Sequence, residues 1–196
     1  MSAKRIFILN GHPAESSLSK AISEAYAEAA VAAGHDVRTK HLHEFEFDAV
    51  YGFSVYNENK PFEPSLEAFQ ADIEWSEHVV LAAPMWWGGL PAKLKGLIDR
   101  TFLAGWAFDT RKLKMGMPTP MLGGRTARAF VTSDTPNFLF GLLYKRALFR
   151  QLKGQIFHFV GIKPLKLTHF SPASHADRDR TGPWIAMAAN LGGKGI

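Results

Sequence analysis

Two kinds of residue pattern alternate along this chain, and their alternation constrains its fold more than any other feature. Five β-prone runs are separated by stretches in which apolar residues recur at the three- and four-residue spacing of a helix. The runs cover residues 4–10, 35–45, 78–84, 126–133 and 163–170. The helical stretches cover residues 18–33, 65–77, 94–102 and 179–193, with one more helix inside 139–161. This order predicts an α/β domain with a largely parallel sheet.

The number of strands fits one known sheet order. Five alternating strands match the flavodoxin-like three-layer sandwich, in which a five-stranded parallel sheet of order 2-1-3-4-5 carries helices on both faces. Ser65 is placed to cap the helix that follows it, and residues 45–64 form an irregular, aromatic-rich loop in this interpretation. No repeat or linker divides the sequence, so residues 1–196 are expected to form one domain.

Composition argues against several classes of protein. Hydrophobic residues make up 46% and charged residues 21%, as in a globular domain, and no apolar run reaches the roughly 18 residues that span a bilayer. Cysteine is absent, which excludes disulfides, thiolate metal sites and cysteine nucleophiles. The first residues fit a strand better than a signal peptide, so the cytoplasm is the expected location. The net charge of +5 comes from scattered residues, which favours a solvated surface over nucleic-acid binding.

Three loops follow strand ends, where open α/β sheets bind their ligands. The first, "NGHPAESSLS" at 10–19, combines serine hydroxyls, His12 and the N-terminus of a helix, and this combination attracts phosphate. Ordinary capping by serine explains the same loop equally well when it is taken alone. Neither GxxxxGK[ST] nor GxGxxG occurs, so the loop is neither a P-loop nor a dinucleotide fingerprint.

The second loop, "APMWWGG" at 83–89, places very large side chains at the tip of a strand. Met85, Trp86 and Trp87 can form a flat apolar wall, and Gly88 lets the backbone approach a ligand closely. The alternative is a tryptophan cluster that is buried against a loop or a partner subunit.

The third loop, "TSDTPNF" at 132–138, carries hydroxyls and a carboxylate that can bond the polar edge of a ring, although a simple turn before a helix has the same composition. A phosphate cradle, an aromatic wall and a polar rim at one sheet edge together predict a phosphorylated, planar ligand, namely a flavin nucleotide.

Other chemistry finds little support in the sequence. His41 and His43 point to one side of a predicted strand with two glutamates nearby, but nothing more favours a metal, and no metal site is predicted. The HExxH and GxSxG motifs are absent. Asp99 and Arg100 are expected on the surface or at a subunit contact, and His158 is expected to be a satisfied core or interface histidine.

The sequence resembles a known family at several motifs. The stretch "APMWWGGLPAKLKGLIDRTFLAGWAF" at 83–108 resembles the signature region of the NAD(P)H:quinone oxidoreductases, the DT-diaphorase-like branch of the flavodoxin fold. "GHPAESSLS" fits that family's phosphate loop, and "IFHFVGIKPLK" resembles its run into the fifth strand. The resemblance covers nearly the whole chain, is weakest at 45–64 and at the C-terminus, and is closest to the shorter bacterial members.

The resemblance implies an enzyme that works as a homodimer with active sites at the interface. A flavin takes hydride from NAD(P)H and passes two electrons to a quinone or similar acceptor by ping-pong kinetics. By matching motif, the phosphates are held by His12, Ser17, Leu18 and Ser19. The flavin ring is contacted by Pro84, Met85, Trp86, Trp87 and Gly88, and its pyrimidine side by Thr132, Ser133, Asp134 and Thr135. The substrate pocket is walled by Trp106 and Phe108, from the partner subunit.

Two departures from the family concern catalysis and the acceptor. Asp134 and Thr135 stand where mammalian members have Gly-Gly, and the downstream Tyr and His of those members have no clear match. Tyr144 is the tyrosine in range, and no histidine lies between 135 and 157. Tyr144 and Asp134 are therefore the candidate catalytic residues, and the physiological acceptor stays open.

Alternatives remain open for the identity of the flavin and for the class of function. Arg178 and Arg180 can supply a site for a second phosphate, which favours FAD over FMN, although a solvated turn has the same sequence. A flavodoxin-type electron carrier is disfavoured by the pI of about 9.5, because such carriers tend to be acidic. The other alternative is a non-catalytic flavin- or nucleotide-binding regulatory subunit of an ion-efflux system.

Overall fold

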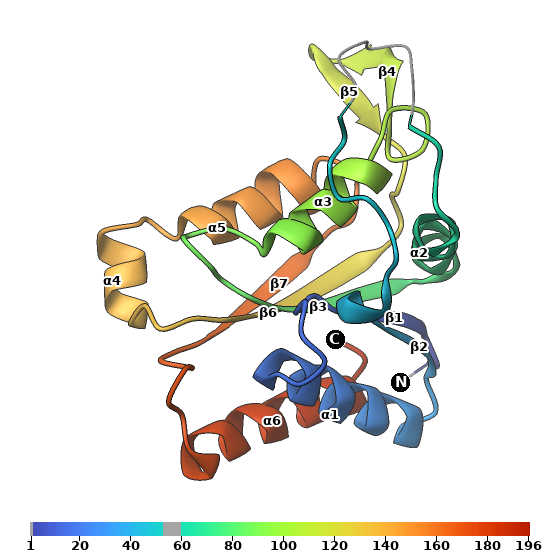
Figure 1. Ribbon diagram of the computed structural model, residues 1–196. Helices are drawn as coiled ribbons and strands as arrows, with labels where there is room; N and C mark the ends of the chain where they lie inside the picture. Colours follow the sequence, from blue (N-terminus) through green and yellow to red (C-terminus); the bar gives the residue numbers. More distant parts are fainter. Residues whose placement is uncertain (1, 53–59) are drawn as a thin grey trace.

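The central sheet has the expected order. The computed structural model describes residues 2–52 and 60–196; residues 53–59, inside the expected irregular loop, lie outside the described residues. The sheet is parallel with strand order β2-β1-β3-β6-β7, which confirms the predicted 2-1-3-4-5 (Figure 1). Its strands are β1 (Arg5–Asn10), β2 (Asp36–His41), β3 (His78–Pro84), β6 (Thr126–Thr132) and β7 (Leu165–Phe170).

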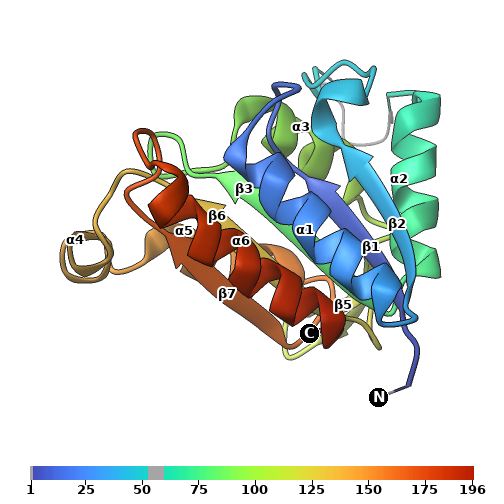
Figure 2. The same ribbon diagram turned by 90° about the horizontal axis from the view of Figure 1, so that it is seen from below.

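Helices cover both faces of this sheet, as predicted (Figures 1 and 2). One face carries α1 (Leu18–Ala32) and α6 (Arg178–Gly193). The other carries α2 (Pro64–Trp75), α3 (Ala92–Thr101), and α5 (Ala147–Arg150) with its π-helical continuation η2 (Gln151–Phe157). The remaining elements are η1 (Leu42–Glu44), α4 (Asn137–Leu142), β4 (Phe108–Lys114) and β5 (Met117–Pro120). Within the described residues, no helix combines the length and apolarity needed to cross a membrane.

Alternate residues of the strands feed two separate cores. Ile6 and Ile8 of β1 pack with α1 and α6, whereas Phe7 and Leu9 pack with the layer of α2 and α3. Successive side chains of a strand point to opposite faces, so a strand covered on both faces must be apolar throughout. This requirement explains why the runs at β1 and β3 are continuously apolar.

Several local predictions are wrong in detail. The helix expected inside 139–161 is split between α4 and α5, because Lys145 and Arg146 both have positive φ values, 46° and 51°. Ser65 does not cap α2; Glu63 stands at the cap position, and Ser65 Oγ donates to the carbonyl of Glu46. The last helix has 16 residues and is not short.

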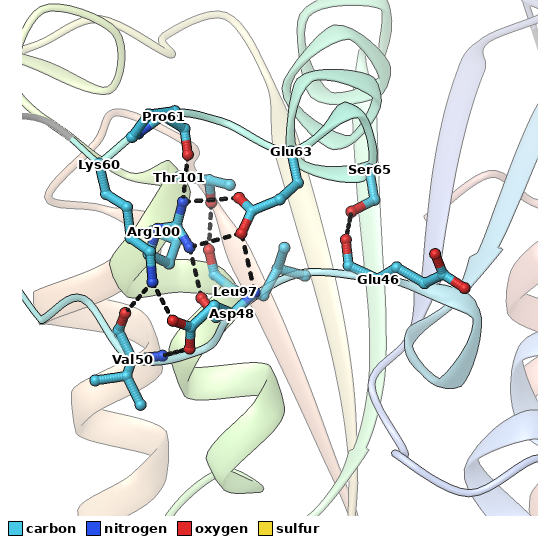
Figure 3. Close-up of polar contacts among 10 residues, drawn as sticks. All are labelled: Glu46, Asp48, Val50, Lys60, Pro61, Glu63, Ser65, Leu97, Arg100 and Thr101. Atoms are coloured by element: carbon cyan, nitrogen blue, oxygen red, sulfur yellow. Dashed lines mark hydrogen bonds and ion pairs between the residues drawn. The ribbon is translucent and has the colours of Figure 1, made fainter.

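Arg100 is fully buried, contrary to the expectation of a surface or subunit contact. Its Nη1 donates to the carbonyl of Asp48 at 2.5 Å, and its Nη2 donates to the carbonyl of Pro61 at 2.8 Å and to Glu63 Oε2 at 2.7 Å (Figure 3). A buried guanidinium needs both a counter-charge and hydrogen-bond acceptors, and this loop supplies both. Asp99, in contrast, remains on the surface and pairs with Lys95.

The segment that wraps Arg100, residues 45–52 and 60–63, is called the strap below. It crosses α3 so closely at Gly96 that an added Cβ would lie 2.6 Å from Ala49 Cβ and 2.9 Å from its carbonyl oxygen. Lys60 closes the strap on itself through Asp48 and the carbonyl of Val50 (Figure 3). An apparently irregular loop is therefore fixed to α3 by packing and by one buried charge.

The Arg100–Glu63 pair predicts an acid-dependent loss of stability. The guanidinium of Arg100 lowers the pKa of Glu63 to about 2, so the folded state binds this proton less readily than the unfolded chain. The stabilisation is complete above the ordinary glutamate pKa and is lost as the pH falls through about 2. Replacing Glu63→Gln should lower the free energy of unfolding by about 2 kcal/mol at pH 7. Urea unfolding from pH 7 to pH 2 measures this.

The matched control is Glu67→Gln, an exposed residue one turn along α2. It should change the free energy of unfolding little at any pH. An equal loss in both variants, or a Glu63→Gln loss that persists unchanged at the acid end, would contradict the role given to the pair.

Candidate functional site

The three loops singled out in the sequence meet at the carboxyl edge of the sheet and enclose a hollow of about 220 Å³. A fourth segment, which follows β7 and which the sequence did not indicate, closes it. The lining consists of His12, Ser16, Ser17, Leu18, Ser19, Pro84, Met85, Trp86, Thr132, Ser133, Asp134, Ala173 and Ser174. Parallel strands end at the same edge of the sheet, so loops distant in sequence become neighbours there.

One end of the hollow is the N-terminus of α1. Ser17 is its N-cap, and Ser17 Oγ accepts from the backbone N–H of Lys20 at 3.1 Å. Ser19 lies two residues on, is buried, and its Oγ has no hydrogen-bond partner among the described residues. A buried hydroxyl without a partner is costly, and the first N–H groups of a helix attract anions. The orphaned hydroxyl and the helix end together fit a phosphate group.

His12 stands beside this helix end as a neutral hydrogen-bond donor. The backbone N–H of Ala14 donates to His12 Nδ1 at 3.0 Å, so the ring proton lies on Nε2. Burial lowers the pKa of His12, which keeps the ring neutral at pH 7. The rings of His12 and Trp86 pack nearly perpendicular to each other, with centroids 5.5 Å apart and an interplanar angle of 84°.

The tryptophan loop is a tight turn in a strained conformation. Trp86 and Gly89 exchange two backbone hydrogen bonds of 2.9 Å, and the two central residues, Trp87 and Gly88, have φ values of 51° and 75°. Two positive φ values define a type I′ turn, which glycine and asparagine favour and a bulky residue does not. Trp87 is fully exposed on this turn, beside the hollow and not among its lining residues.

Asp134 ties two loops of the rim together. Its carboxylate accepts from the backbone N–H of Ala173 at 3.1 Å and of Ser174 at 2.7 Å, and from the Ser174 hydroxyl. These hydrogen bonds lower the pKa of Asp134, so it is ionised at neutral pH. The side chain thus serves as an anchor for the segment after β7.

A second group of hydrogen-bonded polar side chains lies behind the rim. One of its members, His169, was not among the residues predicted from the sequence. Ser133 Oγ is 2.7 Å from His169 Nε2, and His169 Nδ1 is 2.5 Å from Asn137 Oδ1. His169 is the penultimate residue of β7, and its position at a strand end beside the "TSDTPNF" loop is the signal that could have revealed it.

Seven predicted residues do not line the hollow in the single chain: Trp87, described above, and Gly88, Trp106, Phe108, Thr135, Tyr144 and Arg178. Thr135 follows the rim, and its carbonyl accepts from Ser171 Oγ at 2.6 Å. Tyr144 is exposed in the bend between α4 and α5, and Arg178 is exposed at the first position of α6. Gly88 lies on the tryptophan turn.

The strand β4, which begins at Phe108 shortly after Trp106, lies on the opposite side of the molecule from α4 (Figure 1). Trp106 Nε1 donates to Glu74 near the end of α2 at 2.5 Å. Phe108 packs on Phe159 with ring centroids 5.2 Å apart and lines another hollow, of about 270 Å³, between α3 and η2. A single chain therefore does not bring these two aromatic residues to the first hollow.

The strained turn predicts that stability and ligand binding oppose each other at Trp87. Replacing Trp87→Asn creates the favoured Asn-Gly pair, which should raise the free energy of unfolding by about 1 kcal/mol. The same change removes the exposed aromatic ring beside the hollow, so the affinity for a planar ligand that extends out of the hollow over this turn should fall. Thermal unfolding and ligand titration measure the two effects. Trp86→Asn, at a position outside the left-handed region, should give no gain in stability; an equal gain there would remove strain as the cause.

Comparison with known proteins agrees with this architecture. A family model described as "Flavodoxin-like fold" matches residues 4–183. An uncharacterised NAD(P)H oxidoreductase of Escherichia coli, YcaK, is 29% identical over 118 residues, which cover 58% of this chain and 60% of that protein. An uncharacterised NAD(P)H oxidoreductase of Haemophilus influenzae is 25% identical over 190 residues, covering 93% and 91%. The match to YcaK thus spans less than two thirds of that relative's length.

The same fold is found in solved structures. The crystal structure of Smu.1420 from Streptococcus mutans superposes with a TM-score of 0.81 at 26% sequence identity, covering 97% of this chain and 99% of that one. The likeness therefore extends over nearly the whole of both chains.

Proposed function

The chain belongs to the flavodoxin-like fold family, and on that premise we propose that it is a flavin-dependent NAD(P)H oxidoreductase that passes two electrons to a quinone or similar small acceptor. The observation that carries the proposal is the hollow itself. It joins an anion-binding helix end, an aromatic wall and a hydrogen-bonding rim within one site. The names of the Escherichia coli and Haemophilus influenzae relatives, both NAD(P)H oxidoreductases, support the same reaction class.

The residues of the hollow fit a flavin nucleotide. A bound flavin supplies hydride transfer, which no side chain of the protein can perform. Ser17, Ser19, His12 and the first N–H groups of α1 hold the phosphate, and Leu18 packs beside them. Pro84, Met85 and Trp86 cover the ring, while Thr132 and Ser133 bond its polar edge.

The protein's part in the reaction is positional. Asp134, ionised and committed to three hydrogen bonds, anchors the rim and donates no proton. Tyr144 is exposed and does not line the hollow, and the proposal gives it no step within one chain.

A homodimer completes the site in this proposal. The hollow is smaller than the roughly 300–1,000 Å³ of a typical ligand pocket, so a flavin must extend beyond it over exposed surface. Large apolar side chains are exposed on the tryptophan turn and on and just after α4: Trp87, Phe138, Leu142 and Leu143. Such surface is characteristic of an interface. The partner subunit's Trp106 and Phe108 then wall the acceptor pocket.

The reaction is tested by steady-state oxidation of NADH and NADPH with a small quinone. The expected result is protein-dependent oxidation with parallel lines in double-reciprocal plots, as alternating oxidation and reduction of one bound group requires. A protein that binds flavin but oxidises neither nicotinamide would overturn the oxidoreductase proposal. A carrier or a regulatory subunit would then be the better account.

The phosphate site is tested at the orphaned hydroxyl. Replacing Ser19→Ala should weaken FMN binding about tenfold, because one hydrogen bond to a charged group is lost. Riboflavin, which lacks the phosphate, is the matched ligand and should bind both proteins equally. Since Ser19 Oγ has no partner in the described residues, the stability of the free protein should not fall. Equal effects on FMN and riboflavin, measured by fluorescence titration, would place the phosphate elsewhere.

The preference for FAD is tested at Arg178. This residue begins α6, four positions after Ser174 of the rim, and it is exposed; these two facts support its proposed contact with the second phosphate. Replacing Arg178→Ala should weaken FAD binding about tenfold and leave FMN binding unchanged. If Arg178→Ala changes the affinities for FAD and FMN equally, the result would argue for FMN as the resident cofactor.

A further inference from the structure

His169 has no part in the proposed function so far, although it lies directly behind the polar rim. It joins three elements of the fold: its Nε2 meets Ser133 Oγ at the end of β6, and its Nδ1 meets Asn137 Oδ1 at the first position of α4. Ser133 itself is buried and lines the hollow. The series of hydrogen bonds that runs from Asn137 through the imidazole of His169 thus ends at Ser133 Oγ, an atom that a ligand in the hollow would contact.

The imidazole is held firmly in this position. Phe140 lies 4.9 Å from it, centroid to centroid, and Phe149 lies 6.0 Å from it. In the ladder, His169 stands opposite Val131 of β6. The backbone N–H of Ser133 donates to the carbonyl of Phe170 at 3.1 Å, which fixes Ser133 beside the ring.

The hydrogen bonds determine where the protons lie. Asn137 Oδ1 can only accept, so His169 Nδ1 carries the proton and donates. A neutral imidazole has one N–H, which leaves Nε2 as an acceptor. Ser133 must then donate its hydroxyl proton to Nε2 and turn its oxygen lone pairs toward the hollow.

We propose that His169 is a positioning residue that makes Ser133 a hydrogen-bond acceptor toward the hollow, so that the rim selects a ring edge bearing an N–H donor, namely the imide N–H of the bound flavin. This inference rests on the proposed function for the identity of the ligand. The direction of the Ser133 proton is a property of the free protein.

The charges around His169 keep it neutral at pH 7. Burial lowers its pKa, and the positive charge of Arg146 acts in the same direction. The other groups that contact the ring, Asn137 and Phe140 from α4 and Phe149 from α5, do not titrate. When acid protonates the ring, Nε2 becomes a donor to Ser133, and the serine hydroxyl turns to donate into the hollow, where it opposes the imide N–H.

Two measurements test the inference. Long-range nitrogen–proton NMR of the free protein identifies the His169 tautomer, and the inference requires the proton on Nδ1. FMN and its N3-methyl analogue, which lacks the imide N–H, are then titrated into the unchanged protein, Ser133→Ala, His169→Phe and the double variant. His169→Phe keeps an aromatic ring against Phe140 and Phe149 while removing both nitrogens. His158→Gln, outside the hollow's lining, is the matched control.

Ser133→Ala and His169→Phe should each weaken FMN binding about tenfold, and the double variant should be no weaker than either, because both remove one interaction. N3-methyl FMN should bind the unchanged protein about tenfold more weakly than FMN, and neither substitution should weaken it further. The gap in FMN affinity between the unchanged protein and Ser133→Ala should close in acid, once the pH falls below the lowered pKa of His169. His158→Gln should behave like the unchanged protein.

A proton on Nε2, additive losses in the double variant, or equal affinity for FMN and its N3-methyl analogue would overturn the inference while leaving flavin binding intact. Failure of the unchanged protein to bind any flavin would overturn the proposed function and the ligand assignment together. If His169→Phe loses its cooperative unfolding transition, the tautomer, Ser133→Ala and the methylated ligand still decide.

Discussion

The parallel pairing of β3 between β1 and β6 is the constraint on which the site depends. Leu81 of β3 stands opposite Leu9 and Ala129, so the three strands end nearly level and release their loops at one edge. Both faces of these strands are covered by helices, and a shift of register would expose a row of apolar residues. The hollow is therefore positioned by the core. The orphaned hydroxyl of Ser19 and the strained turn at Trp87 are tolerated because that core fixes the ends of their loops.

A second constraint is the buried charge of Arg100. The strap that crosses α3 packs Phe45, Phe47 and Phe62 on the core, and it is also held by acceptors that gather around one guanidinium. The pairing of Arg100 with Glu63 fixes the strap to α3, the helix that begins shortly after the tryptophan turn.

Much of this architecture could be predicted from the sequence because it rests on local patterns. Continuous apolar runs gave the buried strands, helical spacing gave α1 and α3, and the known behaviour of α/β sheets placed the three loops at one edge. The features that were missed depend on distant contacts. Arg100 looks like a surface residue until Asp48, Pro61 and Glu63 fold over it. The hairpin of β4 and β5 is too polar to show a strand pattern.

The candidate site divides in the same way. The serine loop, the tryptophan loop and the "TSDTPNF" loop could be predicted as parts of the site because their residue types suit one ligand. His169 was missed because a lone histidine in a strand belongs to no motif, although the predicted sheet order already places its strand beside the one that ends next to Ser133. Trp106 and Phe108 were assigned by resemblance, and a single chain holds them away from the hollow, so their role depends on a second copy of the protein.

The most direct test of the central claim, that this hollow is a flavin site serving nicotinamide oxidation, is the visible absorption spectrum of the purified protein, recorded before and after NADPH is added without air. The account predicts flavin bands that bleach on addition of the nicotinamide. A colourless protein that stays colourless after incubation with FAD and with FMN would contradict it, and the exposed tryptophan turn would then be an interface with another protein.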